Sequence, residues 1–206
     1  MEPERVAKIW VWYGLEDLFF GFCIEFEPHK PYALFSEIMG LEKILKGYLF
    51  FKKGNEYSSL DSSDAKTKIE AMAKEWGHGI NKLLKEASAF LGQDCVNSIK
   101  QQYFDGYKGQ DLIRAVEAGY MESRYPTSRP FSEQFNIDGM EIYRNPLKSS
   151  GITKFIYSVC QAILLNLKKE IDLSGLGKQF IDIYGAQQPS KRFISLAFEG
   201  DLNKYL

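Results

Sequence analysis

The sequence predicts an all-α protein, an antiparallel helical bundle with at least five helices. Long stretches place apolar residues at three- and four-residue spacing, which is the pattern of an amphipathic helix. Glycine and proline residues separate these stretches, and few segments alternate in the manner of a strand. With 206 residues, of which 45% are hydrophobic, the chain can bury a core of its own. We therefore expect a single domain over residues 1–206, with its core at about 6–171 and a C-terminal extension at 172–206.

The N-terminal half contains three apolar patterns. Val6 to about Glu25 predicts a helix that is apolar around most of its circumference, ended by two prolines at 28 and 31. Tyr32 to Phe51 predicts the clearest helix of the chain. The third pattern runs from Asp64 to about Leu91, but Gly77-His78-Gly79 interrupts it. Because two glycines each cost about 1 kcal/mol inside a helix, we expect a kink or two abutting helices there.

The C-terminal half continues with helical patterns of different lengths. Helices are expected over Cys95–Tyr107, with Val96, Ile99, Tyr103 and Phe104 inward, from Asp111 to about Ser123, and over Ile152–Ile171. Phe131 to Ser150 has no lasting period and predicts a long connection. Gly175 and Gly177 are expected to break the last helix, and Gln179 to Tyr184 to form a short one. The tail from Arg192 carries so many apolar residues that we expect it to dock on the bundle or on a partner.

Composition and charge exclude several classes of protein. The net charge is −1, so there is no strong electrostatic signal for nucleic acid or anionic membrane. No apolar run approaches the length of a membrane span, and the N-terminus lacks the features of a signal peptide. Cys23, Cys95 and Cys160 form no C-x-x-C pair, and each adjoins an apolar pattern. We interpret them as buried residues in a reducing compartment and predict a cytoplasmic protein.

Metal and cofactor motifs are weak or absent in the sequence. Glu75 and His78 have the Glu-x-x-His spacing of a di-iron bundle, but the second pair is missing, because the matching position before His29 is Phe26. A capping or surface role for His78 beside the glycine break is the simpler interpretation. No phosphate-binding loop and no nucleophile elbow is present. We therefore predict no metal and no cofactor.

The best candidate for ligand binding is the segment around Arg124-Tyr125-Pro126. An arginine at a helix end followed by a rigid proline can hold its guanidinium in fixed geometry for a phosphate or carboxylate. The alternative is that Arg124 pairs with a nearby carboxylate and that Tyr125 packs against the bundle. The candidate ligand-binding residues are Arg124, Tyr125, Arg129, Glu117, Glu122 and His78.

Three segments resemble successive parts of HEPN domains, a family of nucleotide-binding helical domains of higher eukaryotes and prokaryotes. The segments are GLEKILKGYLFFKK (Gly40 to Lys53), GHGINKLLKEA (Gly77 to Ala87) and DLIRAVEAGYMESRYPTSRPF (Asp111 to Phe131). The family pattern has an E-K-x-L-K-x-Y-L helix, then a G-H-x-L-x-x-L-L helix, then a stretch near R-Y-P. The resemblance covers roughly Val6 to Ile171. It implies a helical bundle that is often dimeric and is often paired in function with nucleotides, RNA or a nucleotidyltransferase partner.

Many HEPN proteins are ribonucleases whose motif is Arg, then four to six residues, then His. Here the positions that would hold the arginine before His78 are Ala71, Met72 and Ala73. The resemblance therefore implies a binding role without the nuclease chemistry. We predict a non-catalytic HEPN-like module, a homodimer that binds a protein partner or a nucleotide-like ligand.

Two alternatives remain open at the level of the sequence. A small-molecule enzyme could use helix-borne carboxylates whose pKa values are raised by burial. Its candidate residues are Glu16, Asp17, Glu37, Glu117 and Glu122. A ribonuclease with an unrecognised arrangement could instead use His78 and Arg124.

Overall fold

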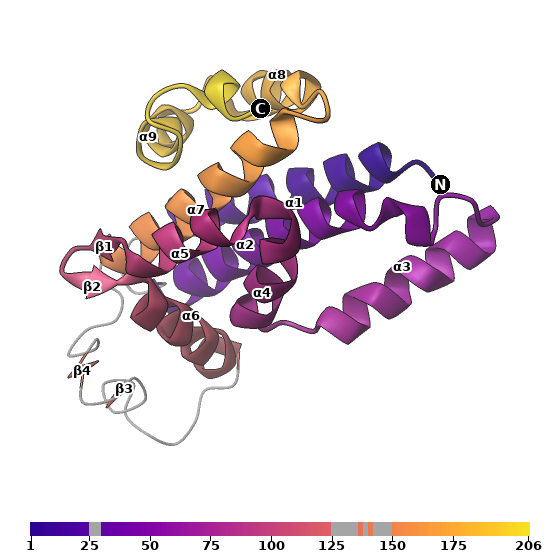
Figure 1. The fold of residues 1–206 in the computed structure, drawn as a ribbon. Helices are drawn as coiled ribbons and strands as arrows, with labels where there is room; N and C mark the ends of the chain where they lie inside the picture. Colours follow the sequence, from indigo (N-terminus) through magenta and orange to yellow (C-terminus); the bar gives the residue numbers. More distant parts are fainter. Residues whose placement is uncertain (25–29, 125–135, 138–139, 142–149) are drawn as a thin grey trace.

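The computed structural model describes residues 1–24, 30–124, 136–137, 140–141 and 150–206. It is a helical bundle with two short hairpins in the described part (Figure 1), which confirms the predicted all-α class. The helices are α1 (Pro3–Cys23), α2 (Lys30–Lys52), α3 (Ser62–Trp76), α4 (Ile80–Leu91), α5 (Gln93–Gln101), α6 (Gly109–Arg124), α7 (Ser150–Lys168), α8 (Ser174–Tyr184) and α9 (Gln188–Ala197), with 3₁₀ turns η1 (Gly54–Glu56) and η4 (Leu202–Lys204). The strands are β1 (Tyr103–Phe104) with β2 (Tyr107–Lys108), and β3 (Asn136–Ile137) with β4 (Met140–Glu141), each pair antiparallel.

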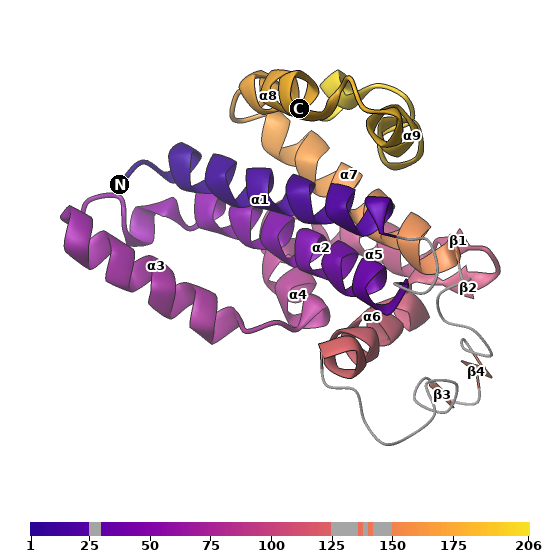
Figure 2. The ribbon, with the colours of Figure 1, turned by 180° about the vertical axis from the view of Figure 1, so that it is seen from behind.

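Helices α1 and α2 form an antiparallel pair at the centre of the fold, and they run side by side in Figure 2. Small residues recur every seventh position on both helices, at Ala7, Gly14 and Gly21 on α1 and at Ala33, Gly40 and Gly47 on α2. A Cβ added to Gly14 would lie 2.9 Å from the carbonyl oxygen of Gly40. The two backbones therefore touch at these positions, which only residues without a bulky side chain permit.

The predicted break at Gly77-His78-Gly79 is confirmed. Helix α3 ends at Trp76, and Gly77 follows with a φ of +64°, a conformation that favours glycine. Helix α4 begins at Ile80 after Gly79. The pattern that runs from Asp64 to Leu91 is therefore two helices, joined by a short turn that carries His78.

The predicted helix over Cys95–Tyr107 is wrong in its second half. Helix α5 ends at Gln101, and the chain then forms the hairpin β1–β2. Asp105 and Gly106 both have positive φ, at 49° and 91°, and Asp-Gly is a favoured pair for a two-residue hairpin turn. Val96, Ile99 and Phe104 are buried as expected, but Tyr103 is 61% exposed because it lies on the open side of the hairpin.

The predicted docking of the C-terminal tail is confirmed, although its helices differ from those expected. Helix α7 ends at Lys168, before Gly175 and Gly177, which lie inside α8 and do not mark the end of α7 as expected. The tail forms α9 and η4. These elements lie over one end of α7 (Figure 1). The ring of Phe193 in the tail contacts Phe19 and Phe22 on α1 and Tyr157 on α7. Phe193, Phe198 and Leu202 of the tail are thus buried against the chain itself, whereas Leu196 remains exposed.

Two further predictions are tested only in part. The long connection predicted over Phe131–Ser150 lies outside the described residues, apart from β3, β4 and the first residue of α7. Cys160 is buried and burial raises the pKa of its thiol, as expected for a core residue. Cys23 and Cys95 are only partly buried.

Buried tyrosines make the stability of the fold depend on alkaline pH. The Tyr57 hydroxyl donates a hydrogen bond to the Phe50 carbonyl at 2.8 Å, and burial raises the pKa of Tyr57 to about 12. Between pH 10 and 12 the unfolded chain releases this proton while the folded chain keeps it. Folding stability should therefore fall as the pH rises through this window, by about 1.4 kcal/mol per pH unit for one tyrosine. Urea unfolding at several pH values should show a smaller slope for Tyr57→Phe, and an unchanged slope would contradict this assignment.

Candidate functional site

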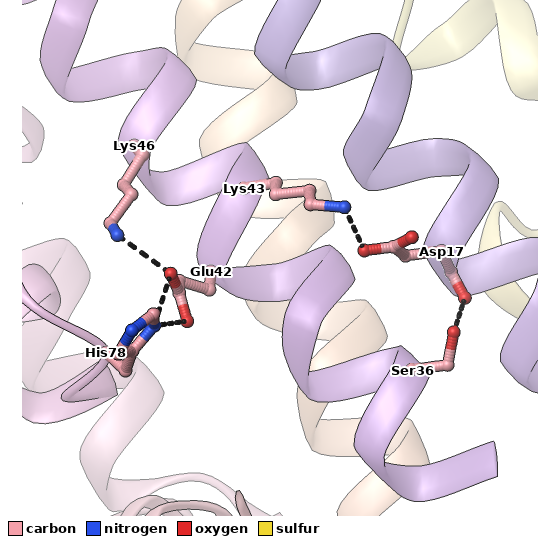
Figure 3. A network of polar contacts seen from close by, with 6 residues as sticks. All are labelled: Asp17, Ser36, Glu42, Lys43, Lys46 and His78. Carbon is pink, nitrogen blue, oxygen red and sulfur yellow. Dashed lines mark hydrogen bonds and ion pairs between the residues drawn. The ribbon is translucent and has the colours of Figure 1, made fainter. Parts of the chain in front are cut away.

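A buried ionic cluster joins α2 to the turn between α3 and α4 (Figure 3). We call Glu42, Lys46 and His78 the Glu42 cluster. The Lys46 ammonium lies 2.8 Å from the Glu42 carboxylate, and the His78 Nδ1 lies 3.1 Å from both carboxylate oxygens. One carboxylate therefore binds a lysine of its own helix and an imidazole from 36 residues further along the chain.

Local structure explains how these three side chains meet. Glu42 and Lys46 are four residues apart, so they project from the same face of α2. The break at Gly77 and Gly79 frees the chain from helical geometry, and His78 reaches α2 from that turn. Lys46 also lies over the ring of Trp10 on α1, 5.9 Å from its centroid. The cluster thus ties α1, α2 and the α3–α4 turn together.

Burial differs sharply within the Glu42 cluster. The side chains of Glu42 and Lys46 are 3% and 4% exposed, whereas that of His78 is 50% exposed. Charges of opposite sign offset each other's desolvation cost only when they are in contact, as these are. The imidazole is therefore the part of the cluster that solvent reaches. A carboxylate that holds one ring nitrogen fixes the orientation of such an imidazole.

Glu117 supports the same turn from α6. Its Oε1 accepts a hydrogen bond from the backbone N–H of Asn81 at 2.9 Å, in the first turn of α4. Because α4 has no side-chain cap of its own, this carboxylate satisfies an N–H group that would otherwise lack a helical partner. A negative charge at a helix N-terminus is also favourable. The structure therefore places Glu117 and His78 at one junction.

The other predicted ligand-binding residues are described only in part or not at all by the structure. Arg124 and Glu122 lie in the last turn of α6, but the placement of their side chains is outside the described structure. Tyr125 and Arg129 lie outside the described residues. Glu42 and Lys46 were not among the predicted ligand-binding residues. Their signal was an acid and a base four residues apart, inside the segment that resembles HEPN domains and beside the apolar stripe of α2.

Three other carboxylates, Glu37, Glu16 and Asp17, were candidates for a small-molecule enzyme. Each of them binds a partner on another helix. Glu37 accepts hydrogen bonds from Thr153 and Tyr157 of α7, both at 2.9 Å. Glu16 accepts one from Tyr184 of α8 at 2.9 Å.

Asp17 pairs with Lys43 of α2 at 2.6 Å (Figure 3). Burial raises the pKa of the Asp17 carboxyl, and the Lys43 ammonium partly offsets that rise. Each of these described carboxylates has a role in joining helices.

Two further features are absent from the described part of the chain. Within the described ranges, no three or more His, Cys, Asp and Glu side chains are grouped so that they could hold a metal ion. No helix of the described residues is both long enough and apolar enough to cross a bilayer.

Comparisons with known proteins add no family assignment. No family model matches the chain, and searches of curated proteins and of solved structures found no match. The resemblance to HEPN domains therefore depends on the residues quoted above.

Proposed function

We propose that the chain is a non-catalytic, HEPN-like helical module of the cytoplasm that forms a homodimer and binds a nucleotide-like ligand at the Glu42 cluster. One observation carries the proposal. The segments Gly40–Lys53 and Gly77–Ala87 resemble two separate HEPN motifs, and their polar residues Glu42, Lys46 and His78 are in contact. Contact between motif residues 36 positions apart is expected when both motifs belong to one site.

The chemistry of the cluster favours recognition by hydrogen bonding over attraction by a strong field. Glu42 and Lys46 cancel each other's charge, and His78, which also binds Glu42, is the half-exposed member of the cluster. Arg124 lies seven residues beyond Glu117 on α6, about 10 Å further along the helix axis. A nucleotide bound at the α3–α4 junction would thus extend from the His78 imidazole toward the C-terminal end of α6, where the predicted Arg124–Arg129 segment begins.

The absence of nuclease activity is part of this proposal. The three positions that would carry the catalytic arginine before His78 hold Ala71, Met72 and Ala73. Without a guanidinium there, phosphate charge in a transition state has no matching cation from this motif. Purified protein is expected not to cleave RNA.

A thermal-shift titration with nucleoside mono-, di- and triphosphates tests the ligand. At least one nucleotide should raise the melting temperature, because a ligand that binds only the folded state stabilises it. The variant His78→Gln should weaken that binding about tenfold, since it removes a hydrogen bond worth about 1–1.5 kcal/mol.

Lys66→Gln is the matched control for the nucleotide titration. Lys66 is exposed near the start of α3, away from the turn that carries His78, so its variant should bind like the wild type. Equal weakening by both variants would contradict the assignment of the site. So would RNA cleavage that disappears in His78→Ala, because it would make the protein a nuclease. Capture of a nucleotidyltransferase with no nucleotide binding would point to the protein-partner version instead.

The proposed homodimer has a candidate surface near the end of α1 and the start of α2. Phe20 and Tyr32 are 58% and 62% exposed there, although both are large apolar rings. Burial of two such rings per copy would contribute several kcal/mol to association. The double variant Phe20→Ser, Tyr32→Ser is expected to raise the dimer dissociation constant at least tenfold in analytical ultracentrifugation.

Tyr103→Ser is the control for the dimer experiment. Tyr103 is equally exposed, but it belongs to the β1–β2 hairpin. It should leave the dissociation constant unchanged. A wild-type protein that sediments as a monomer at every accessible concentration would end the dimer proposal.

A further inference from the structure

A groove runs between the N-terminal half of α1 and the start of α8. Its volume is about 570 Å³, which is in the range of sites for small molecules. All the residues that line it lie in the described part of the chain, and Figure 2 shows α8 above α1. None of its lining belongs to the Glu42 cluster.

One wall of the groove, formed by α1, is apolar. Trp12 on this wall, and Leu176 across the groove on α8, are partly buried and pack against the core. The Trp12 indole meets the ring of Phe180 on α8 edge to face, with centroids 6.5 Å apart, so its orientation is held by the fold. Ile9 and Tyr13 continue the same wall and remain exposed. The groove therefore offers a rigid surface for a flat ring.

The guanidinium group of Arg5 lies at one end of this wall. Arg5 lies four residues before Ile9 and seven before Trp12, so the three share one face of α1. Among the described residues, Arg5 makes no ion pair and no side-chain hydrogen bond. The neighbouring cation Lys8 is already paired with Glu4 at 2.6 Å. Arg5 is thus the positive group of the groove that a ligand would engage.

The acids of the lining do not neutralise Arg5. Glu4 is bound to Lys8, and Glu2, at the N-cap of α1, forms no ion pair with Arg5 in the described structure. Two acids and two bases line the groove, so its total charge is zero. Selection of an anion would therefore come from direct contact with one guanidinium.

We propose that this groove binds a small aromatic carboxylate. A guanidinium presents a planar fork of donors that matches both oxygens of a carboxylate. The aromatic body of the ligand would lie on Trp12 and Tyr13, and the Gln179 amide lies on the opposite wall, on α8. The site is separate from the proposed nucleotide site. Trp10, which faces Lys46, lies on the other side of α1 from Trp12.

A matched pair of probes tests the charge and the ring separately. 2-Naphthoate carries the carboxylate, whereas 2-naphthamide has the same rings and no charge. Calorimetric titration of the full chain should show naphthoate binding at least tenfold more tightly than naphthamide. Arg5→Gln should remove that difference by weakening naphthoate alone. Ile9→Glu, which places an acid on the apolar wall, should weaken both probes.

The control variant is Arg192→Gln, because Arg192 lines a different pocket, beside Cys23 between α1 and α9. It removes the same charge and should leave naphthoate binding unchanged. The proposal is overturned if naphthoate does not bind at millimolar concentration, or if it binds no better than naphthamide. It is also overturned if Arg192→Gln weakens naphthoate and Arg5→Gln does not. Circular dichroism spectra of each variant would show that the helices are intact.

Discussion

Replacing Phe193 with alanine is expected to lower the free energy of unfolding by about 3–5 kcal/mol. Phe193 on α9 is fully buried, and its ring contacts those of Phe19, Phe22 and Tyr157 on the bundle, at centroid distances between 5.4 and 6.1 Å. It also contacts rings within the tail itself. The side chain is therefore the centre of the interface between the C-terminal segment and α1 and α7.

The loss would be visible as a large change in melting temperature. For a chain of this length, about 4 kcal/mol corresponds to a fall on the order of 10 °C. Leu196→Ala is the control on the same helix. Leu196 is exposed, and its variant should stay within about 0.5 kcal/mol of the wild type. Equal melting temperatures for the two variants would contradict the docking of the C-terminal segment on α1 and α7 through Phe193.

The helices were predictable because their apolar periodicity is strong and local. Helices α2 and α7 were expected within a few residues of their observed bounds, and the break at Gly77 to Gly79 was expected from glycine alone. The hairpin at Asp105 and Gly106 was missed because a two-residue turn interrupts a pattern that still reads as helical. Its signal was the Asp-Gly pair, which favours positive φ at both positions.

The candidate site was harder to predict because it depends on tertiary contact. His78 and Glu117 were chosen from their places beside a glycine break and on a helix face, and both lie at the α3–α4 junction. Glu42 and Lys46 belong to an ordinary pair of charges four residues apart, which most helices expose to solvent. Only the fold shows that this pair is buried and in contact with His78.

Close packing of α1 on α2 is a second property that periodicity does not reveal. Hydrophobic patterns identify the buried face of a helix, but the distance between two helices depends on the smallest residues at their contact. Here Gly14 and Gly40 lie opposite each other, so backbone approaches backbone. The seven-residue spacing of small residues is visible in the sequence of each helix. Only the pairing of α1 with α2 shows that these residues allow the two backbones to touch.

Gly40→Ala is accordingly expected to destabilise the fold by about 1–3 kcal/mol. The new Cβ would lie 2.7 Å from Leu18 Cγ and 2.8 Å from the Gly14 carbonyl oxygen. The Leu18 side chain can rotate away, but the Gly14 carbonyl is part of the α1 backbone. The two helices must therefore move apart to make room for the new Cβ. This loss would exceed the gain of about 1 kcal/mol that alanine brings to a helix interior.

Gly175→Ala is the control for this prediction. Nothing lies within 4 Å of the Cβ position of Gly175 in α8, so the same change there should be neutral or stabilising. Chemical unfolding of both variants compares them directly, and equal stabilities would contradict the close contact of α1 and α2.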